Sequence, residues 1–184
     1  MRPHRLIGGA ATAAAVVMIA FAGTSPALAL PPTSRVVKDA VEPEKGYDIT
    51  VVTLRSAPKS TRPAVVLVKH GRAVKVGDAI DAWFDFDGDK VPDIHVSGDA
   101  FSEFTVHEAK SFTKDGKDIS GQDCVRLAMA GSASKFRLFP ACVGSPIGFA
   151  VAVKSSSAGT PVASDDWAPE TEKFTKRVLT APLS

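Results

Sequence analysis

The segment 85–93 carries the side chains with the clearest chemical potential in this chain. It places four carboxylates within nine residues, at Asp85, Asp87, Asp89 and Asp93. Carboxylates at alternate positions of a tight loop can converge on one hard cation such as Ca²⁺, which takes about 6–8 oxygen ligands. The spacing therefore predicts a calcium site, with side-chain oxygens from the four aspartates and a backbone oxygen from Val91.

The acidic segment has two other interpretations, an EF-hand and a hairpin without metal. An EF-hand counted from Asp85 would need Gly at position 6 and a bidentate acid at position 12, where the chain has Lys90 and Val96. This mismatch disfavours an EF-hand. A solvated acidic hairpin with Asp-Gly turn chemistry and no metal remains the alternative to a strand-loop-strand calcium site.

Signals for catalysis are weaker. The carboxylates from which a glycosidase-type pair could be drawn are Asp81, Asp85, Glu103 and Glu108. The chain contains no Gly-x-Ser-x-Gly elbow, no His-Glu-x-x-His and no Gly-rich phosphate loop. The spacing of His70, His95 and His107 does not suit zinc. His95 and His107 could lie near the acidic loop, but they are expected to be ordinary exposed histidines. No catalytic residue is therefore assigned.

Two tryptophans could build a binding surface. Trp83 lies between Ile80 and Phe84 in a strand-like run, so it is expected in the core. Trp167 is either an exposed platform for stacking a sugar or a hydrophobic pin that anchors the C-terminal tail, and the pin is favoured because large aromatic side chains are seldom exposed.

The N-terminal segment resembles a secretory signal. Arg2 and Arg5 precede an apolar run over residues 6–22, and Ala27-Leu28-Ala29 fits a cleavage site, so residues 1–29 are predicted to be removed. A membrane anchor is the alternative. The whole chain has 22 basic and 20 acidic residues. Loss of the two arginines balances the charge, which argues against a nucleic-acid partner. The mature protein is expected outside the cell with no membrane span.

The chain has two cysteines, Cys124 and Cys142. In an oxidising compartment such a pair is predicted to form one disulfide. Two separate thiols or a metal pair are the less favoured alternatives.

The hydrophobic pattern predicts an all-β fold. Residues 30–46 suggest an irregular lead-in, and residues 47–184 a single domain with a partly irregular C-terminal tail. Apolar or alternating runs predict strands at 48–54, 64–69, 79–86, 93–96, 101–107, 124–129, 135–139 and 149–154. About eight short strands without a helical period indicate an antiparallel β-sandwich, jelly-roll or immunoglobulin-like, or a barrel.

Two resemblances add to this interpretation. The run from Asp85 to Val96 resembles the Asp-x-Asp-Gly-Asp calcium loops of FG-GAP/VCBS and thrombospondin-type proteins, which implies Ca²⁺ as a ligand. The run Gly46-Tyr47-Asp48-Ile49, with Trp83 to Asp89, resembles uncharacterised secreted actinobacterial proteins. It is more loosely similar to DOMON/family-9 carbohydrate-binding sandwiches, which implies sugar or haem binding.

These observations favour a secreted, non-catalytic binding or structural module stabilised by calcium. Its expected target is a cell-envelope polysaccharide or a protein. A small secreted hydrolase that uses carboxylates of residues 78–108 is the alternative function.

Overall fold

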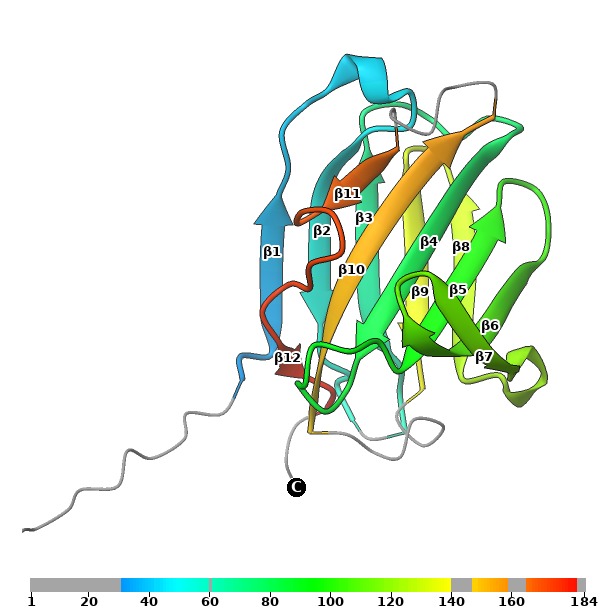
Figure 1. The fold of residues 1–184 in the computed structure, drawn as a ribbon. Coiled ribbons are helices and arrows are strands. Elements are labelled where there is room, and N and C mark those ends of the chain that lie inside the picture. The colour runs from blue at the N-terminus through cyan, green and yellow to red at the C-terminus, as the bar shows by residue number, and fades with distance from the viewer. Residues whose placement is uncertain (1–30, 60, 140–146, 159–164, 182–184) are drawn as a thin grey trace, which may run out of the picture.

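The protein folds as two antiparallel β-sheets packed face to face (Figure 1). The computed structural model describes residues 31–59, 61–139, 147–158 and 165–181. The predicted all-β sandwich is confirmed. The predicted signal peptide lies outside the described residues.

Sheet A has the strand order β1-β2-β3-β9-β8. Its strands are β1 (Ser34–Lys38), β2 (Ile49–Arg55), β3 (Ala64–His70), β8 (Val125–Ala130) and β9 (Ala133–Leu138).

Sheet B has the order β11-β10-β4-β5-β6-β7, with β12 paired to β10. Its strands are β4 (Asp78–Asp85), β5 (Ile94–Asp99), β6 (Phe104–Ser111), β7 (Lys114–Asp118), β10 (Gly148–Ser157), β11 (Asp166–Ala168) and β12 (Val178–Leu179). Two 3₁₀ helices, η1 (Pro43–Lys45) and η2 (Ser120–Gln122), complete the described elements.

Alternation along the strands builds the core between the sheets. In β3, Val66 and Val68 are fully buried, whereas Val65 and Leu67 face outward and are half-buried. Side chains of a strand point alternately to its two faces, so this pattern assigns one face of β3 to the core. Phe84 from β4 meets Phe136 from β9 edge to face, with ring centroids 6.0 Å apart, and this contact joins the two sheets.

The structure contains strands that the sequence did not predict. The described residues form twelve strands, rather than about eight. Within the segment 30–46, predicted to be irregular, the chain forms β1 and η1, and β1 pairs with β2 along its whole length. Strand β7 is short, polar and largely exposed, so it lacks the apolar alternation by which a strand is recognised.

Candidate functional site

The acidic loop connects β4 to β5 at one end of sheet B. Oxygens of Asp85, Asp87 and Asp89 lie within 4.8 Å of one another, and Asp93 is not part of this group. Asp85 is buried, and the other two are exposed. Three of the four predicted side-chain ligands therefore converge, and their oxygens could hold a metal ion.

Backbone N–H groups of the loop already use these carboxylates. Asp85 accepts hydrogen bonds from the N–H groups of Gly88, at 2.6 Å, and Lys90, at 3.3 Å. Asp93 accepts one from Phe86 at 2.6 Å, and the recorded contact of Val91 is its N–H donating to Asp89 at 2.7 Å. The loop is thus closed by its own turn chemistry, and a cation would add to a shape that is already formed.

The negative charge of the loop affects Asp93. Burial raises the pKa of Asp93, and the charges of Asp87 and Asp85 raise it further, although the Phe86 N–H opposes them. A bound cation would offset this repulsion.

Arg177 holds the acidic loop from the C-terminal tail. Its guanidinium donates hydrogen bonds to the carbonyl oxygens of Phe86, of Asp87 at 3.0 Å and of Gly148 at 2.8 Å. Gly88 allows this approach, because its φ is +91° and a Cβ there would lie 2.5 Å from the guanidinium. The arginine supplies positive charge at the base of the loop and occupies carbonyls that a cation would otherwise use.

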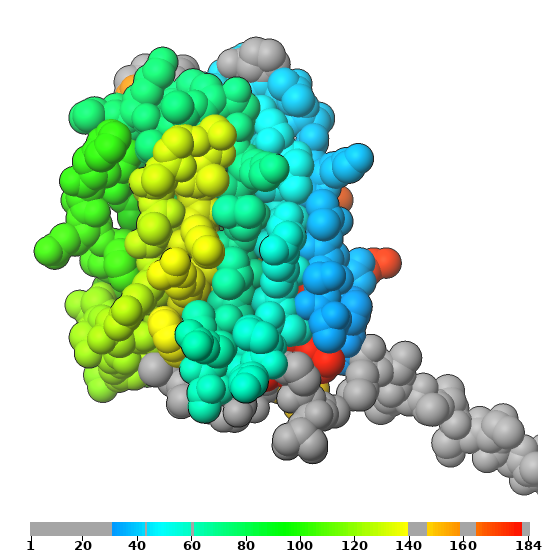
Figure 2. Space-filling model, turned by 180° about the vertical axis from the view of Figure 1, so that it is seen from behind, coloured from blue at the N-terminus to red at the C-terminus, as the bar shows by residue number. Residues whose placement is uncertain are grey.

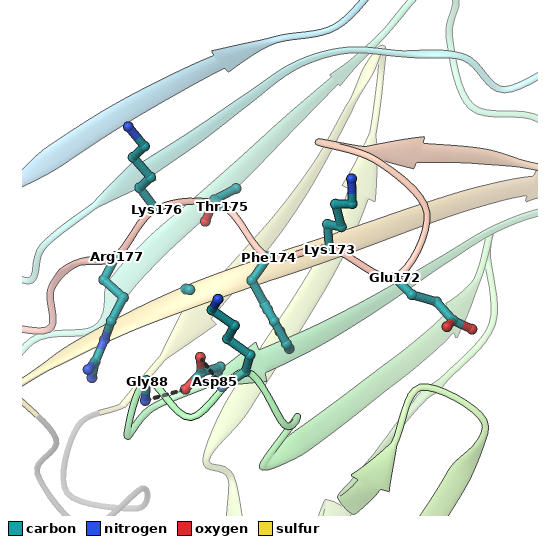
Figure 3. Close-up of a pocket in the computed structure, with 10 residues that line it drawn as sticks. Asp85, Gly88, Glu172, Lys173, Phe174, Thr175, Lys176 and Arg177 are labelled. Carbon is teal, nitrogen blue, oxygen red and sulfur yellow. Dashed lines mark hydrogen bonds between the residues drawn. The ribbon is translucent and has the colours of Figure 1, made fainter.

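A pocket of about 480 Å³ lies between the acidic loop and the tail. Figure 3 shows the hydrogen bond of Asp85 with Gly88, and shows Phe174 and Arg177 extending from the tail toward the loop, whereas Lys176 points away. Four polar side chains that line this pocket, those of Asp85, Lys173, Thr175 and Arg177, already bond to other parts of the protein.

A second group of side chains lies on the outer face of sheet B. The pairing registers place Ala152, Trp83, His95 and His107 directly beside one another across β10, β4, β5 and β6. Trp83 stacks on His95, with ring centroids 4.5 Å apart, and on Trp167 of β11, at 5.1 Å. Because Ala152 is small, the face has room beside Trp83 for the larger rings that cover it.

Two further rings complete this aromatic cluster. Phe112, in the β6–β7 turn, lies 5.6 Å from Trp83 and 5.1 Å from Phe174 of the tail, measured between ring centroids. Trp83 is consequently only 3% exposed, although its strand position faces away from the main core. The prediction that Trp83 is buried is confirmed, but it is buried in a satellite cluster on the outer face.

Charged groups form a chain beside the aromatic cluster. His95 lies with Nε2 3.2 Å from Asp81 and Nδ1 2.9 Å from Asp115, and Lys154 Nζ lies 3.0 Å from Asp81. Burial would raise the pKa of Asp81, but hydrogen bonding to His95 and the charge of Lys154 outweigh burial and hold the pKa below its usual value. Lys154 Nζ also lies over the rings of Trp83 and Trp167, at 5.8 and 5.9 Å.

An open pocket of about 420 Å³ borders these groups, and we call it the aromatic pocket. Its lining residues are Lys45, Trp83, Phe112, Thr113, Lys154, Asp165, Trp167, Thr171 and Glu172. The indole N–H of Trp83 is buried without an acceptor among the described residues. An unpaired buried donor costs about 1–3 kcal/mol, so a ligand oxygen that reached it would be favoured.

Strand β11 positions Trp167 at this pocket. The Asp166 carboxylate accepts a hydrogen bond from the Ile49 N–H at 2.5 Å and so ties β11 to β2 of the other sheet. Burial raises the pKa of Asp166 to about 6, and the charges of Asp39 and Asp48 add to this although the Ile49 N–H opposes it. Trp167 is half-buried, so it both anchors the tail on Trp83 and presents ring surface to the pocket.

Sequence reasoning missed the histidines. His95 was expected to be exposed, but it is bonded on both ring nitrogens, and the side chain is 13% exposed. His70 is buried, stacks on Tyr47 with centroids 3.7 Å apart, and lies 3.0 Å from Ser134 Oγ; burial lowers its pKa to about 4. The alternation of side chains along the strands was the sequence signal that could have placed His95, because it puts His95 on the same face as Trp83.

The predicted disulfide involves one described cysteine. Cys124 is buried directly before β8, whereas Cys142 lies outside the described residues. The pairing therefore stays a prediction.

The hydrolase alternative needs two carboxylates at the separation found in glycosidases. Asp81 and Asp85 lie on one strand four residues apart, which separates them by about 13 Å at the usual rise. That spacing exceeds the roughly 5–9.5 Å of glycosidase pairs. Glu103 and Glu108 are exposed.

No helix in the described part of the chain has the length and apolar character needed to cross a membrane. Comparison of the chain with protein-family models, with curated proteins and with solved structures finds no match. Fold and site geometry therefore carry the functional argument.

Proposed function

We propose that this protein is a non-catalytic binding module that acts outside the cell and holds a sugar unit of a cell-envelope polysaccharide in the aromatic pocket. The observation that carries the proposal is the pocket itself, where Trp83, Trp167 and Phe112 adjoin hydroxyl and charged side chains on the open face of a β-sheet. The extracellular location rests on the signal-like residues 1–29.

The lining chemistry favours an uncharged, hydroxyl-rich ligand. Binding sites combine apolar and aromatic walls with a few placed polar groups. The C–H face of a sugar ring can pack on an indole, while its hydroxyls bond to Thr113, Thr171 or Glu172. Lys154 is already neutralised by Asp81 at 3.0 Å, and Lys45 donates to the Asp165 carbonyl at 3.2 Å, so neither cation is left wholly for an anionic ligand.

Calcium enters the proposal as a stabilising ligand of the acidic loop. The three converging aspartates would hold the ion, and Ca²⁺ would supply positive charge there. The hydrolase alternative has less support, because Asp81 is held ionised by His95 and Lys154, and a general acid needs a raised pKa.

The proposal is tested by screening the purified protein against neutral oligosaccharides built from glucose, mannose, galactose and N-acetylhexosamines. The best ligand is then titrated calorimetrically. Trp167→Ala should weaken binding at least tenfold, whereas Phe101→Ala, which removes a ring that is 76% exposed outside the aromatic pocket, should leave binding unchanged.

Thr113→Val separates ligand contact from folding, since it removes one hydroxyl from the pocket rim and should weaken binding with an unchanged melting temperature. Absence of binding to every oligosaccharide, or equal affinity of wild type and Trp167→Ala, would overturn the proposal. Release of reducing sugar from the bound oligosaccharide would favour the hydrolase instead.

A further inference from the structure

The charged side chains on the outer face of sheet A are all basic. Side chains that alternate with the buried ones point away from the core, and six of these outward side chains are basic: Lys38, Arg55, Lys69, Arg126, Lys135 and Arg137. The other outward positions of the five strands hold Ser, Thr, Ala, Val and Leu, without an acidic residue. We call this surface the basic face.

The strand registers show how the six cations are arranged. Arg55 lies opposite Val65, Val65 opposite Arg137, and Arg137 opposite Arg126, so one row of the sheet carries three arginines. The row that contains Lys69 also carries Lys38 two strands away, and Lys135 lies in the row between. With about 4.8 Å between strands, neighbouring charges are separated by about 5–10 Å.

Few of these cations are neutralised within the protein. Arg126 pairs with Asp123 at 3.5 Å, in a contact where both side chains are mostly exposed. The other five have no ion pair with any described residue. Like charges gathered on one face without internal partners raise the local potential and attract polyanions.

Figure 2 shows this face from outside, with β1 in blue, β2 and β3 in cyan and teal, and β9 in yellow side by side. A face several strands wide suits an extended polymer that crosses the strands and meets several cations in turn.

We propose that the basic face binds a linear anionic polysaccharide, at a site separate from the aromatic pocket on the opposite sheet. The outward strand positions hold no aromatic side chain on which the bases of single-stranded nucleic acid could stack. The one ring that an ion–ring contact joins to these cations, Phe139 just after β9, has the Arg126 guanidinium over it, 5.4 Å from its centroid. Of the large apolar side chains exposed in the described residues, Val36 alone lies among the cations, and the most exposed, Val76 and Phe101, lie in loops outside sheet A. One valine provides too little apolar surface for insertion into a membrane. With nucleic acid and membrane disfavoured, charge complementarity favours a soluble or wall-bound anionic polymer as the ligand of the basic face.

The test measures binding to immobilised polygalacturonate and dextran sulfate, with neutral dextran as the reference polymer. Wild type should bind both polyanions at low salt, should not bind dextran, and should lose most of its affinity between 50 and 300 mM salt because screening weakens exposed charges. The triple variant Arg55→Gln, Lys69→Gln, Arg137→Gln should bind at least tenfold more weakly at low salt.

A matched variant controls for net charge. Lys110→Gln, Lys114→Gln, Lys117→Gln also removes three exposed cations, but from β6 and β7 of sheet B, and it should keep wild-type affinity. All six positions are exposed, so melting temperatures should change little.

An equal loss in both triple variants would overturn the inference, as would absence of binding by wild type at low salt. Tighter binding to duplex DNA, or to vesicles containing an anionic phospholipid, than to polygalacturonate would likewise overturn it. Trp167→Ala should leave polyanion binding unchanged, so failure of the sugar-binding proposal is distinguishable from failure of this one.

Discussion

His95 is held between two carboxylates, and this fixes its protonation. An ionised carboxylate only accepts hydrogen bonds, so contacts of Nδ1 with Asp115 and of Nε2 with Asp81 require both ring nitrogens to donate. Burial lowers the pKa of His95, but the hydrogen bonds and charges of Asp81 and Asp115 outweigh burial and raise the pKa above its usual value. The imidazolium stacks on Trp83 and so supports the floor of the aromatic pocket.

A raised histidine pKa makes stability depend on pH in a defined direction. The contribution of His95 should be complete below the unfolded-state pKa of about 6.5 and should be lost as pH rises through the higher folded-state pKa. His95→Gln should therefore lower the free energy of unfolding by about 1–2 kcal/mol at pH 6, and by less at pH 9. Urea unfolding at several pH values measures this difference.

His107→Gln is the control for the His95 substitution, since His107 lies directly opposite His95 on the neighbouring strand and has no histidine–carboxylate pair among the described residues. It should show no such pH-dependent difference from wild type. A constant loss for His95→Gln across the pH range would contradict the imidazolium assignment.

At the scale of elements, the acidic loop and the tail form one unit. The loop leaves β4 at Asp85, and Arg177 reaches it from the segment just before β12, more than eighty residues later in the sequence. The same segment supplies Phe174 to the aromatic cluster, and Glu172 lines both pockets. Stabilisation of the loop by a cation would therefore also stabilise the part of the tail that borders the aromatic pocket.

Calcium should stabilise the fold through the acidic loop. With a dissociation constant near 1 mM, 10 mM Ca²⁺ would add about 1.4 kcal/mol, or about 3–5 °C in melting temperature. Asp87→Asn with Asp89→Asn should abolish this shift, because it removes two of the three converging carboxylates. Scanning calorimetry with calcium and with chelator makes the comparison.

A second double variant shows whether the calcium effect belongs to the loop. Glu103→Gln with Glu108→Gln also removes two exposed carboxylates, but outside the loop, and should keep the full shift. If wild type melts at the same temperature with and without calcium, the acidic hairpin without metal is the correct interpretation.

Features that depend on local interactions could be predicted from the sequence, whereas features that depend on contacts between distant segments could not. Runs such as residues 64–69 identify strands because alternation and β-branched residues act locally, and β3 (Ala64–His70) confirms that prediction. The aromatic pocket depends on Trp83, Phe112 and Trp167, which come from three elements far apart in the sequence. The local sequence pattern does not predict that these three side chains come together, because their proximity depends on β10 pairing with both β4 and β11.

At the scale of the whole molecule, charge is sorted between faces. The sequence predicts a balanced mature chain, and this balance argues against a nucleic-acid partner. In the fold, six cations of β1, β2, β3, β8 and β9 share one outer face that holds no acidic side chain at its outward strand positions. Sheet B carries both signs, with Asp81, Asp115 and the acidic loop beside exposed lysines of β6 and β7. Net charge does not describe such a molecule, because alternation along each strand decides which face receives each charge.

The two proposed binding faces lie on opposite sheets and should act independently, since no described residue belongs to both. Protein captured on immobilised polygalacturonate should therefore still bind the soluble oligosaccharide, with the affinity it shows free in solution. Surface plasmon resonance with sequential injection measures this. The Arg55, Lys69, Arg137 triple variant should fail at capture yet bind the oligosaccharide normally in solution, and Trp167→Ala should be captured yet fail to bind the oligosaccharide. Competition between the two ligands would instead place both on one face and contradict the two-sided arrangement.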